Sequence, residues 1–163
     1  MNKILVVGCP GAGKSTFSQK LNKILNVPLY HLDNIWHKSD KTHITRDEFD
    51  LKLKEILLTD EWIIDGDYSR TYEIRIEYAN TIIFLDYPTK LCLKSAEERI
   101  GTKRIDIPFS ETTIDQRFKE SIINWKEETF PKLKDLLDKY KDKKEIIVFK
   151  SREEANNYLK SLK

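Results

Sequence analysis

Residues 8–16 of the chain read Gly-Cys-Pro-Gly-Ala-Gly-Lys-Ser-Thr and match the pattern G-x-x-x-x-G-K-[ST] at every defined position. An apolar run at residues 4–7 precedes this segment, and residues 14–25 carry apolar side chains at helical spacing. This order leaves little freedom to the fold, because the turn must aim backbone N–H groups at one anion and the helix must present its positive end there. The pattern therefore predicts a phosphate-binding loop at the carboxyl end of a buried strand.

Each position of this loop can be assigned a contact. The amine of Lys14 can reach the β- and γ-phosphates of a nucleotide, and the hydroxyl of Ser15 is placed to ligate Mg²⁺. Cys9 is interpreted as a small residue that fits the loop, since the neighbouring chemistry needs no thiol. The loop thus implies ATP and Mg²⁺ as cofactors. The residues predicted to bind the nucleotide here are Gly8, Pro10, Gly11, Ala12, Gly13, Lys14, Ser15 and Thr16.

Four further short apolar runs alternate with helical patterns. The length of 163 residues is about that of one domain, and no repeat divides it, so we predict a single domain over residues 1–163. Alternating strands and helices predict a parallel sheet with helices on both faces, a three-layer α/β/α fold. The aperiodic stretch at residues 100–113 is predicted to be a lid. The predicted strands are 4–7, 27–32, 62–64, 81–85 and 145–149, and the predicted helices are 14–25, 46–58, 89–100, 113–129, 131–140 and one after residue 151.

Capping residues predict where several of these helices begin. Thr45 and Thr113 each stand three residues before a Glu or Gln, which is the spacing of a capping box. Thr89 and Ser151 are also predicted to cap their helices.

Composition excludes several classes of protein. Lys and Arg number 29 against 27 Asp and Glu, so the net charge of +2 does not support direct DNA binding. Cys9 and Cys92 cannot form the disulfide framework of a small secreted domain, and the three His lack the spacing of a zinc site. No apolar stretch approaches the ~20 residues of a membrane helix, and the amino terminus does not read as a signal peptide. We therefore expect a cytoplasmic monomer or homodimer without membrane contact.

Carboxylates follow three of the predicted strands. In an open parallel sheet, ligands bind beyond the carboxyl ends of the strands. We interpret Asp33 and Asp65 as site residues that hold Mg²⁺ through water or accept the proton of an attacking hydroxyl, and we assign Asp65 with Ser15 to the metal. Asp86 precedes Tyr-Pro, and both a turn and a functional interpretation stay open for it.

Phosphoryl transfer also needs positive charge around the transferred group. Arginine binds phosphate in a fork, which favours Arg70 after the third strand, Arg99 and Arg104 beside the predicted lid, and one arginine on the following helix. Lys103 and Lys119 are interpreted as solvated surface charges. The predicted catalytic residues are Lys14, Asp33, Asp65, Arg70, Arg99, Arg104 and Arg117.

Together these segments resemble a known family. Residues 8–16, Leu32-Asp33, 62–70 (Trp-Ile-Ile-Asp-Gly-Asp-Tyr-Ser-Arg) and 81–86 are similar to the bacterial DNA topology modulation protein (FlaR-like) group of adenylate-kinase-like P-loop kinases. The phosphate loop is specific only to the superfamily, whereas residues 62–70 are more specific to the group. The resemblance covers nearly the whole chain and implies the strand order 2-3-1-4-5.

The resemblance also implies roles for individual residues. Asp65 and Arg70 are similar in position to the Asp and Arg of the Asp-Gly-Phe-Pro-Arg segment of nucleoside monophosphate kinases, which organise the Mg²⁺ waters and bind the acceptor phosphate. Arg99 is similar to the arginine that opens a lid over the nucleotide. Ser151 and Arg152 fall where such kinases wrap backbone around adenine.

Two departures from the group concern the acceptor pocket. Asp67 stands where Asn is expected, and His37 and Lys41 stand where tryptophans are expected.

Two functions from different classes follow. The first is an ATP-dependent phosphotransferase for a small molecule, either a nucleoside monophosphate bound by Arg70 or a hydroxyl compound with Asp33 as base. The second is a nucleotide-dependent regulator that affects DNA topology or gene expression. We favour the kinase, because a pure binding module needs neither lid arginines nor strand-end carboxylates.

Overall fold

The computed structural model describes residues 1–163 as a five-stranded, all-parallel sheet with helices on both faces. Its strand order, β2-β3-β1-β4-β5, confirms the predicted fold class and order. Parallel pairing requires each connection to cross the sheet, and helices supply these crossings. The strands are β1 (Lys3–Gly8), β2 (Leu29–His31), β3 (Trp62–Asp65), β4 (Thr81–Leu85) and β5 (Glu145–Phe149).

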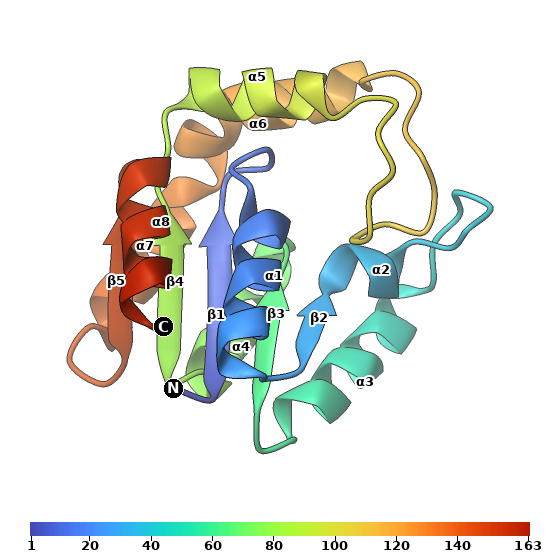
Figure 1. The fold of residues 1–163 in the computed structure, drawn as a ribbon. Helices are drawn as coiled ribbons and strands as arrows, with labels where there is room; N and C mark the ends of the chain where they lie inside the picture. The colour runs from blue at the N-terminus through green and yellow to red at the C-terminus, as the bar shows by residue number, and fades with distance from the viewer.

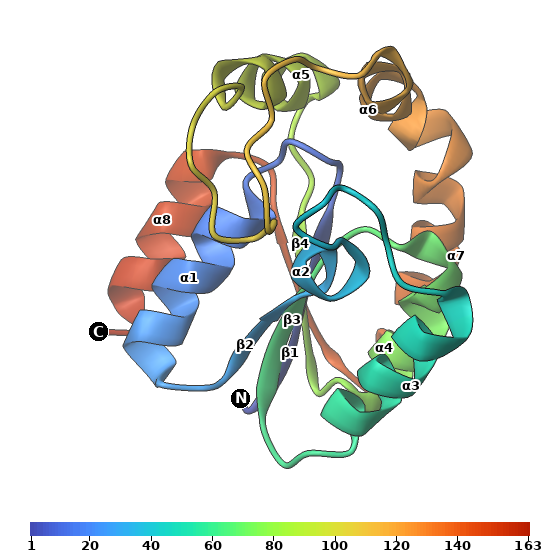
Figure 2. The same cartoon turned by 90° about the vertical axis from the view of Figure 1, so that its right-hand side faces the viewer.

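The helices form two layers around the sheet and a cap above its carboxyl end. One face carries α1 (Lys14–Leu25) and α8 (Arg152–Ser161) (Figure 2). The other face carries α3 (Arg46–Leu57), α4 (Tyr72–Tyr78) and α7 (Phe130–Tyr140). Figure 1 shows α5 (Thr89–Glu98) and α6 (Gln116–Glu128) lying across the carboxyl ends of the strands, and the short helix α2 (Leu32–Trp36) above β2. The site predicted at this end of the sheet is therefore covered by α5 and α6.

The core follows from the double covering of the sheet. The four apolar residues of β1, Ile4–Val7, are fully buried, because both faces of this central strand lie under helices. They belong to a core cluster of 35 residues that extends to both helical layers. A rigid central strand thus supports the phosphate loop, which begins where β1 ends.

Several helix boundaries differ from the prediction. Residue Leu32 does not continue β2 but begins α2, so Asp33 lies in the first turn of a short helix. The cap of α6 is Asp115 and not Thr113, because the Asp115 carboxylate accepts the Arg117 N–H at 2.8 Å. Thr89 is the first residue of α5 and caps nothing, since Pro88 occupies the N-cap position.

Other local predictions are confirmed. Thr45 Oγ1 accepts the Glu48 N–H at 3.2 Å, so Thr45 is the N-cap of α3 as predicted. The Glu48 carboxylate accepts the Thr45 hydroxyl and not its backbone N–H, so the reciprocal bond of a capping box is not formed. Ser151 caps α8 by accepting the Glu154 N–H. The helix α4, by contrast, was not predicted.

The segment between α5 and α6, residues 99–115, contains no helix or strand and is called the lid segment below. Its two arms are joined where the Gly101 N–H donates to the Glu111 carbonyl at 2.7 Å. Its tip meets α2, where the Asn34 amide donates to the Ile105 carbonyl at 2.6 Å (Figure 1). The lid segment therefore reaches from the cap down to the sheet edge. Separately, none of the helices combines the length and apolarity needed to cross a membrane.

Candidate functional site

The loop between β1 and α1 leaves a set of backbone donors unused. The N–H groups of Gly13, Lys14, Ser15 and Thr16 donate to no protein acceptor, and no side chain caps α1. Gly11 has a φ of +84°, and a Cβ there would lie 2.2 Å from the Cys92 carbonyl oxygen, so only glycine fits. These donors, with the positive end of α1, are the groups that the predicted anion site would use.

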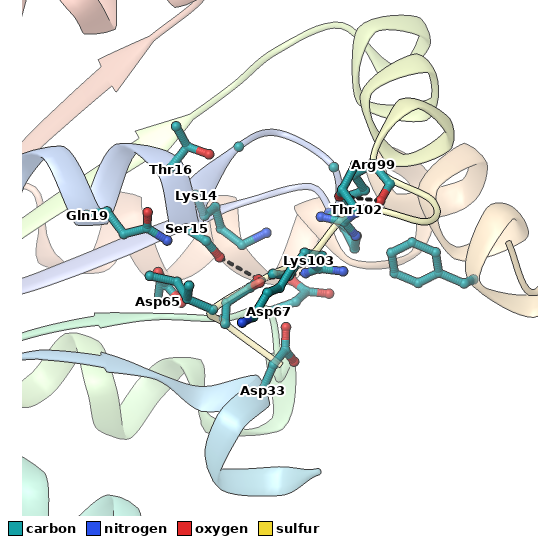
Figure 3. Close-up of a pocket in the computed structure, with 18 residues that line it drawn as sticks. Lys14, Ser15, Thr16, Gln19, Asp33, Asp65, Asp67, Arg99, Thr102 and Lys103 are labelled. Atoms are coloured by element: carbon teal, nitrogen blue, oxygen red, sulfur yellow. Dashed lines mark hydrogen bonds and ion pairs between the residues drawn. The ribbon is translucent and has the colours of Figure 1, made fainter. Parts of the chain in front are cut away.

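A cavity of about 380 Å³ opens in front of these donors (Figure 3). It is lined by the phosphate loop, by carboxylates at the ends of β2 and β3, and by the lid segment. Lys103 is exposed, in line with its interpretation as a surface charge, but it also lines this cavity. Lys119 does not line it and lies 3.5 Å from Glu97. The sequence-predicted residues that line the cavity are Pro10, Gly11, Gly13, Lys14, Ser15, Thr16, Asp33, Asp65, Arg99 and Arg104.

The amine of Lys14 is held by its own loop. Lys14 Nζ donates to the carbonyls of Gly8 and Cys9 at 2.9 and 3.1 Å. The two predicted loop residues outside the lining, Gly8 and Ala12, are buried behind it. The charge of Lys14 is therefore kept at the place where phosphates would enter.

Asp65 is paired with a histidine that the sequence analysis did not assign to the site. His31 Nδ1 lies 3.0 and 2.8 Å from the two carboxylate oxygens of Asp65, and both residues are buried. They are direct partners in the β2–β3 register, which places their side chains together. Burial lowers the pKa of His31, but the hydrogen bond and charge of Asp65 outweigh it, so that the pKa is raised. The signal was present in the sequence as two polar residues at adjacent strand ends.

Asp33 lines the same cavity from the first turn of α2. Its Oδ1 accepts the Tyr68 hydroxyl at 2.7 Å, and its other carboxylate oxygen accepts no hydrogen bond from the protein. Burial raises the pKa of Asp33, and the charges of Asp106 and Asp65 add to this, although Tyr68 and Lys14 oppose it. Asp33 is thus a carboxylate with raised proton affinity and a free oxygen.

Arg99 and Arg104 both line the cavity from the lid segment, but they differ in their hydrogen bonding. Arg99 Nε is buried without a hydrogen-bond partner, and its guanidinium lies 5.5 Å from the Phe118 ring centroid. Arg104 is fully engaged, since it binds the Asp106 carboxylate through Nε and Nη2 at 2.9 and 2.6 Å and Glu111 at 2.9 Å. Arg99 is therefore the lid cation with unused donor capacity.

Two predicted arginines lie outside the cavity. Arg70 points away and forms a bidentate pair with Asp50 of α3, at 2.7 and 3.0 Å, in which both side chains are nearly half exposed. The Arg117 side chain, at the start of α6, does not line the cavity. Asp86 pairs with Lys150 at the surface and lines neither this cavity nor the one described next.

A second cavity of about 290 Å³ lies on the other side of the phosphate loop, between α1 and α8. Arg152, Phe17 and Tyr87 are part of its lining, and Arg152 also contacts the Ser95 hydroxyl. Ser151, the neighbouring candidate, is occupied as the cap of α8. Gly13 and Thr16 line both cavities, so the two spaces share the phosphate loop as a wall.

The turn after β3 is held by a buried cation that the sequence analysis missed. Arg75 of α4 is fully buried and donates to the carbonyls of Gly66, Asp67 and Tyr68 at 2.9, 2.6 and 3.2 Å. Asp67 accepts the Trp125 Nε1–H at 3.1 Å and also the Tyr72 hydroxyl. These bonds fix the backbone that follows Asp65, because a buried guanidinium must satisfy its donors.

The oxygen donors at the loop suit Mg²⁺. Ser15 and Asp65 line the same cavity and offer a hydroxyl and a carboxylate, the hard ligands that this ion prefers. No group of three or more His, Cys, Asp or Glu side chains is placed to hold a metal on its own. A magnesium ion here would therefore need nucleotide phosphates and water as further ligands, as in other phosphate-loop sites.

Comparison with solved structures finds similar folds in proteins that are named as kinases. A shikimate kinase from Acinetobacter baumannii in complex with shikimate aligns with a TM-score of 0.62 at 14% identity, over 99% of this chain and 90% of that chain. A gluconokinase from Sinorhizobium meliloti 1021 aligns with a TM-score of 0.58 at 14% identity, over 99% and 89%. A deoxyadenosine kinase from M. mycoides with bound dCTP aligns with a TM-score of 0.52 at 12% identity, over 97% and 96%. At these identities the similarity shows the fold alone.

Sequence comparisons identify no closer relative. No protein-family model matches the chain, and no curated protein matches it. The resemblance to the FlaR-like group therefore stays a prediction.

Proposed function

We propose that this protein transfers the γ-phosphoryl group of ATP to a small-molecule acceptor. The observation that carries the proposal is one cavity that joins four unused N–H donors, the free guanidinium of Arg99 and the carboxylates of Asp33 and Asp65. Phosphoryl transfer requires donors that bind the phosphates, a cation near the transferred group and a base near the acceptor hydroxyl. The three solved structures of similar fold are all named as kinases of small molecules.

Each group has a place in the reaction. The N–H donors and Lys14 hold the β- and γ-phosphates, and Arg99 neutralises charge on the transferred group. Mg²⁺, held by Ser15 and Asp65, would supply further charge neutralisation for these phosphates. The acceptor oxygen forms a bond to the γ-phosphorus while the bond to the bridging oxygen breaks and ADP leaves with that electron pair. Asp33 takes the hydroxyl proton on its free oxygen.

The second cavity supports a site for adenine. It adjoins the phosphate loop and offers Phe17 and Tyr87 as apolar walls beside Arg152. We propose that the nucleotide base lies here, with its phosphates passing over Gly13 and Thr16 into the first cavity. This keeps the predicted role for Arg152.

The acceptor remains to be chosen between two classes. A nucleoside monophosphate would need Arg70, whose exposed pair with Asp50 contributes only about 0.2–1 kcal/mol and can be exchanged for a phosphate. A hydroxyl compound without phosphate needs only Asp33 and its neighbours.

The test is ADP release from Mg-ATP by the purified protein. The acceptors to compare are nucleoside monophosphates, nucleosides, shikimate, gluconate and polyols, with supercoiled DNA separately. The proposal expects stimulation by one small acceptor, loss of it in Lys14→Ala, and its retention in Lys23→Ala, an exposed lysine of the same helix. ATP binding without acceptor-stimulated turnover, with a higher rate on DNA, would instead support the nucleotide-dependent regulator.

A further inference from the structure

The hydroxyl of Ser15 is bound by a carboxylate from the lid segment. Ser15 Oγ donates to Asp106 Oδ2 at 2.7 Å, and the dashed line from Ser15 in Figure 3 marks this bond. The two residues are 91 positions apart in the sequence. The strand-end carboxylate that lines the same cavity, Asp65, is instead occupied by His31.

Asp106 is fixed in this position by the protein. Only 5% of the residue is exposed, and Arg104 binds both of its carboxylate oxygens while Glu111 holds Arg104 from the other side. A carboxylate that an arginine anchors through both oxygens is a firm acceptor for one hydroxyl proton.

The direction of this hydrogen bond matters for a cation. A serine hydroxyl has one proton and two lone pairs. When the proton is held by Asp106, the lone pairs of Oγ are left for a cation in the cavity. When no acceptor holds it, the proton competes with the cation for the same space. Carboxylates that orient metal ligands in this way affect metal affinity by about 10–100-fold.

We propose that Asp106 is a positioning residue for magnesium, acting through the hydroxyl of Ser15. The magnesium site is then complete only when the lid segment lies on the phosphate loop, so lid closure and Mg-nucleotide binding are coupled. This inference rests on the proposed binding of Mg-ATP at the loop. The alternative is that Asp106 acts as a latch, which blocks Ser15 until the nucleotide displaces it. A latch predicts that removing Asp106 strengthens the binding of Mg-nucleotide, whereas a positioning residue predicts that it weakens it.

The experiment measures the dissociation constant of a fluorescent ATP analogue with Mg²⁺ and with EDTA. In the wild type, Mg²⁺ tightens binding. In Asp106→Ala this magnesium-dependent gain falls by about tenfold or more, whereas affinity in EDTA changes little. The double variant Ser15→Ala/Asp106→Ala loses no more than Ser15→Ala alone, because both changes remove one interaction.

The matched control is Glu111→Gln. It removes the other carboxylate partner of Arg104 but leaves the bond between Asp106 and Ser15, so the ratio of the two dissociation constants stays near that of the wild type. Asp106→Asn keeps the packing of the side chain and covers the case in which the alanine variant does not fold. In this variant a neutral amide replaces the carboxylate, and the gain in nucleotide affinity from Mg²⁺ again falls.

Three results would overturn the inference. Tighter binding of Mg-nucleotide by Asp106→Ala would identify a latch, and an equal loss with and without Mg²⁺ would identify a general role in lid structure. If Mg²⁺ tightened nucleotide binding as much in both Asp106 variants as in the wild type, Asp106 would have no role in positioning magnesium, and the proposed function would be unaffected. If the wild type showed no nucleotide binding at all, the proposed function would fail as well.

Discussion

Replacing His31 with alanine tests whether the pair with Asp65 is ionic in the folded protein. The change removes a partner that contacts both oxygens of a buried carboxylate. Breaking a fully buried ion pair costs about 3–5 kcal/mol, and one hydrogen bond to a charged group contributes about 1.5–3 kcal/mol. Because Asp65 lines a cavity that water can enter, we expect the lower part of this range, about 2–3 kcal/mol of unfolding free energy near pH 6.

The loss should depend on pH in one direction. Burial lowers the pKa of His31, but Asp65, Asp106 and Asp33 together raise it above the ordinary value of about 6.5. The folded protein therefore binds this proton more tightly than the unfolded chain does. The resulting stabilisation is fully present below the unfolded-state pKa and disappears as the pH rises through the folded-state pKa. The difference between wild type and His31→Ala should thus shrink from pH 6 to pH 9.

Urea unfolding at several pH values measures this difference directly. The control is His37→Ala, since His37 packs edge-on against Phe109 and has no carboxylate partner. Its effect on unfolding free energy should show no such decline. A loss in His31→Ala that is constant with pH, or that grows as the pH rises, would refute an ionic pair and leave only a neutral hydrogen bond.

Three other changes separate the parts of the site. Asp33→Asn should abolish acceptor-stimulated turnover and leave ATP affinity unchanged, and in the wild type the acidic limb of the rate profile should lie above the usual range of Asp because the pKa of Asp33 is raised. Arg99→Ala should weaken ATP binding about tenfold or more, as expected for a phosphate-binding charge pair, whereas Arg70→Ala should leave ATP binding intact and raise KM only for a phosphate-bearing acceptor. Gly11→Ala should lower the melting temperature and impair nucleotide binding, because its Cβ would lie 2.2 Å from a backbone oxygen at a φ that alone costs about 1–3 kcal/mol; nucleotide titration and thermal unfolding check these outcomes.

The features that the sequence predicted are those with a local cause. The loop with unused N–H groups, the N-cap at Thr45 and the cap at Ser151 each depend on residues within a few positions, and all three are present where the sequence predicts them. The prediction failed at Thr113 because Asp115 lies closer to the start of the apolar pattern of α6 and caps it instead. It also extended β2 to Leu32, where an apolar residue serves a short helix as well as a strand.

The missed site residues have partners far away in the sequence. Asp106 meets Ser15 across 91 positions, and nothing in its aperiodic surroundings marks it as different from other lid residues. Arg70 is the opposite case. Its residue type and position predicted a place in the site, but it pairs with the carboxylate of Asp50 and lies outside the cavity. Residue type predicts which groups can serve a site, but the choice among them depends on tertiary partners.

The three carboxylates around the cavity differ in their hydrogen-bond partners, and this difference suits them to different roles. Asp65 lies against the imidazole of His31, and Asp106 lies against the guanidinium of Arg104. Asp33 receives only the neutral hydroxyl of Tyr68, and burial next to the other two carboxylates raises its pKa. A carboxylate that orients a metal ligand must stay ionised, whereas one that accepts a proton needs higher proton affinity. Because its pKa is raised and one of its oxygens accepts no hydrogen bond, Asp33 is the carboxylate of the three that best fits the proposed role of taking a proton from the acceptor.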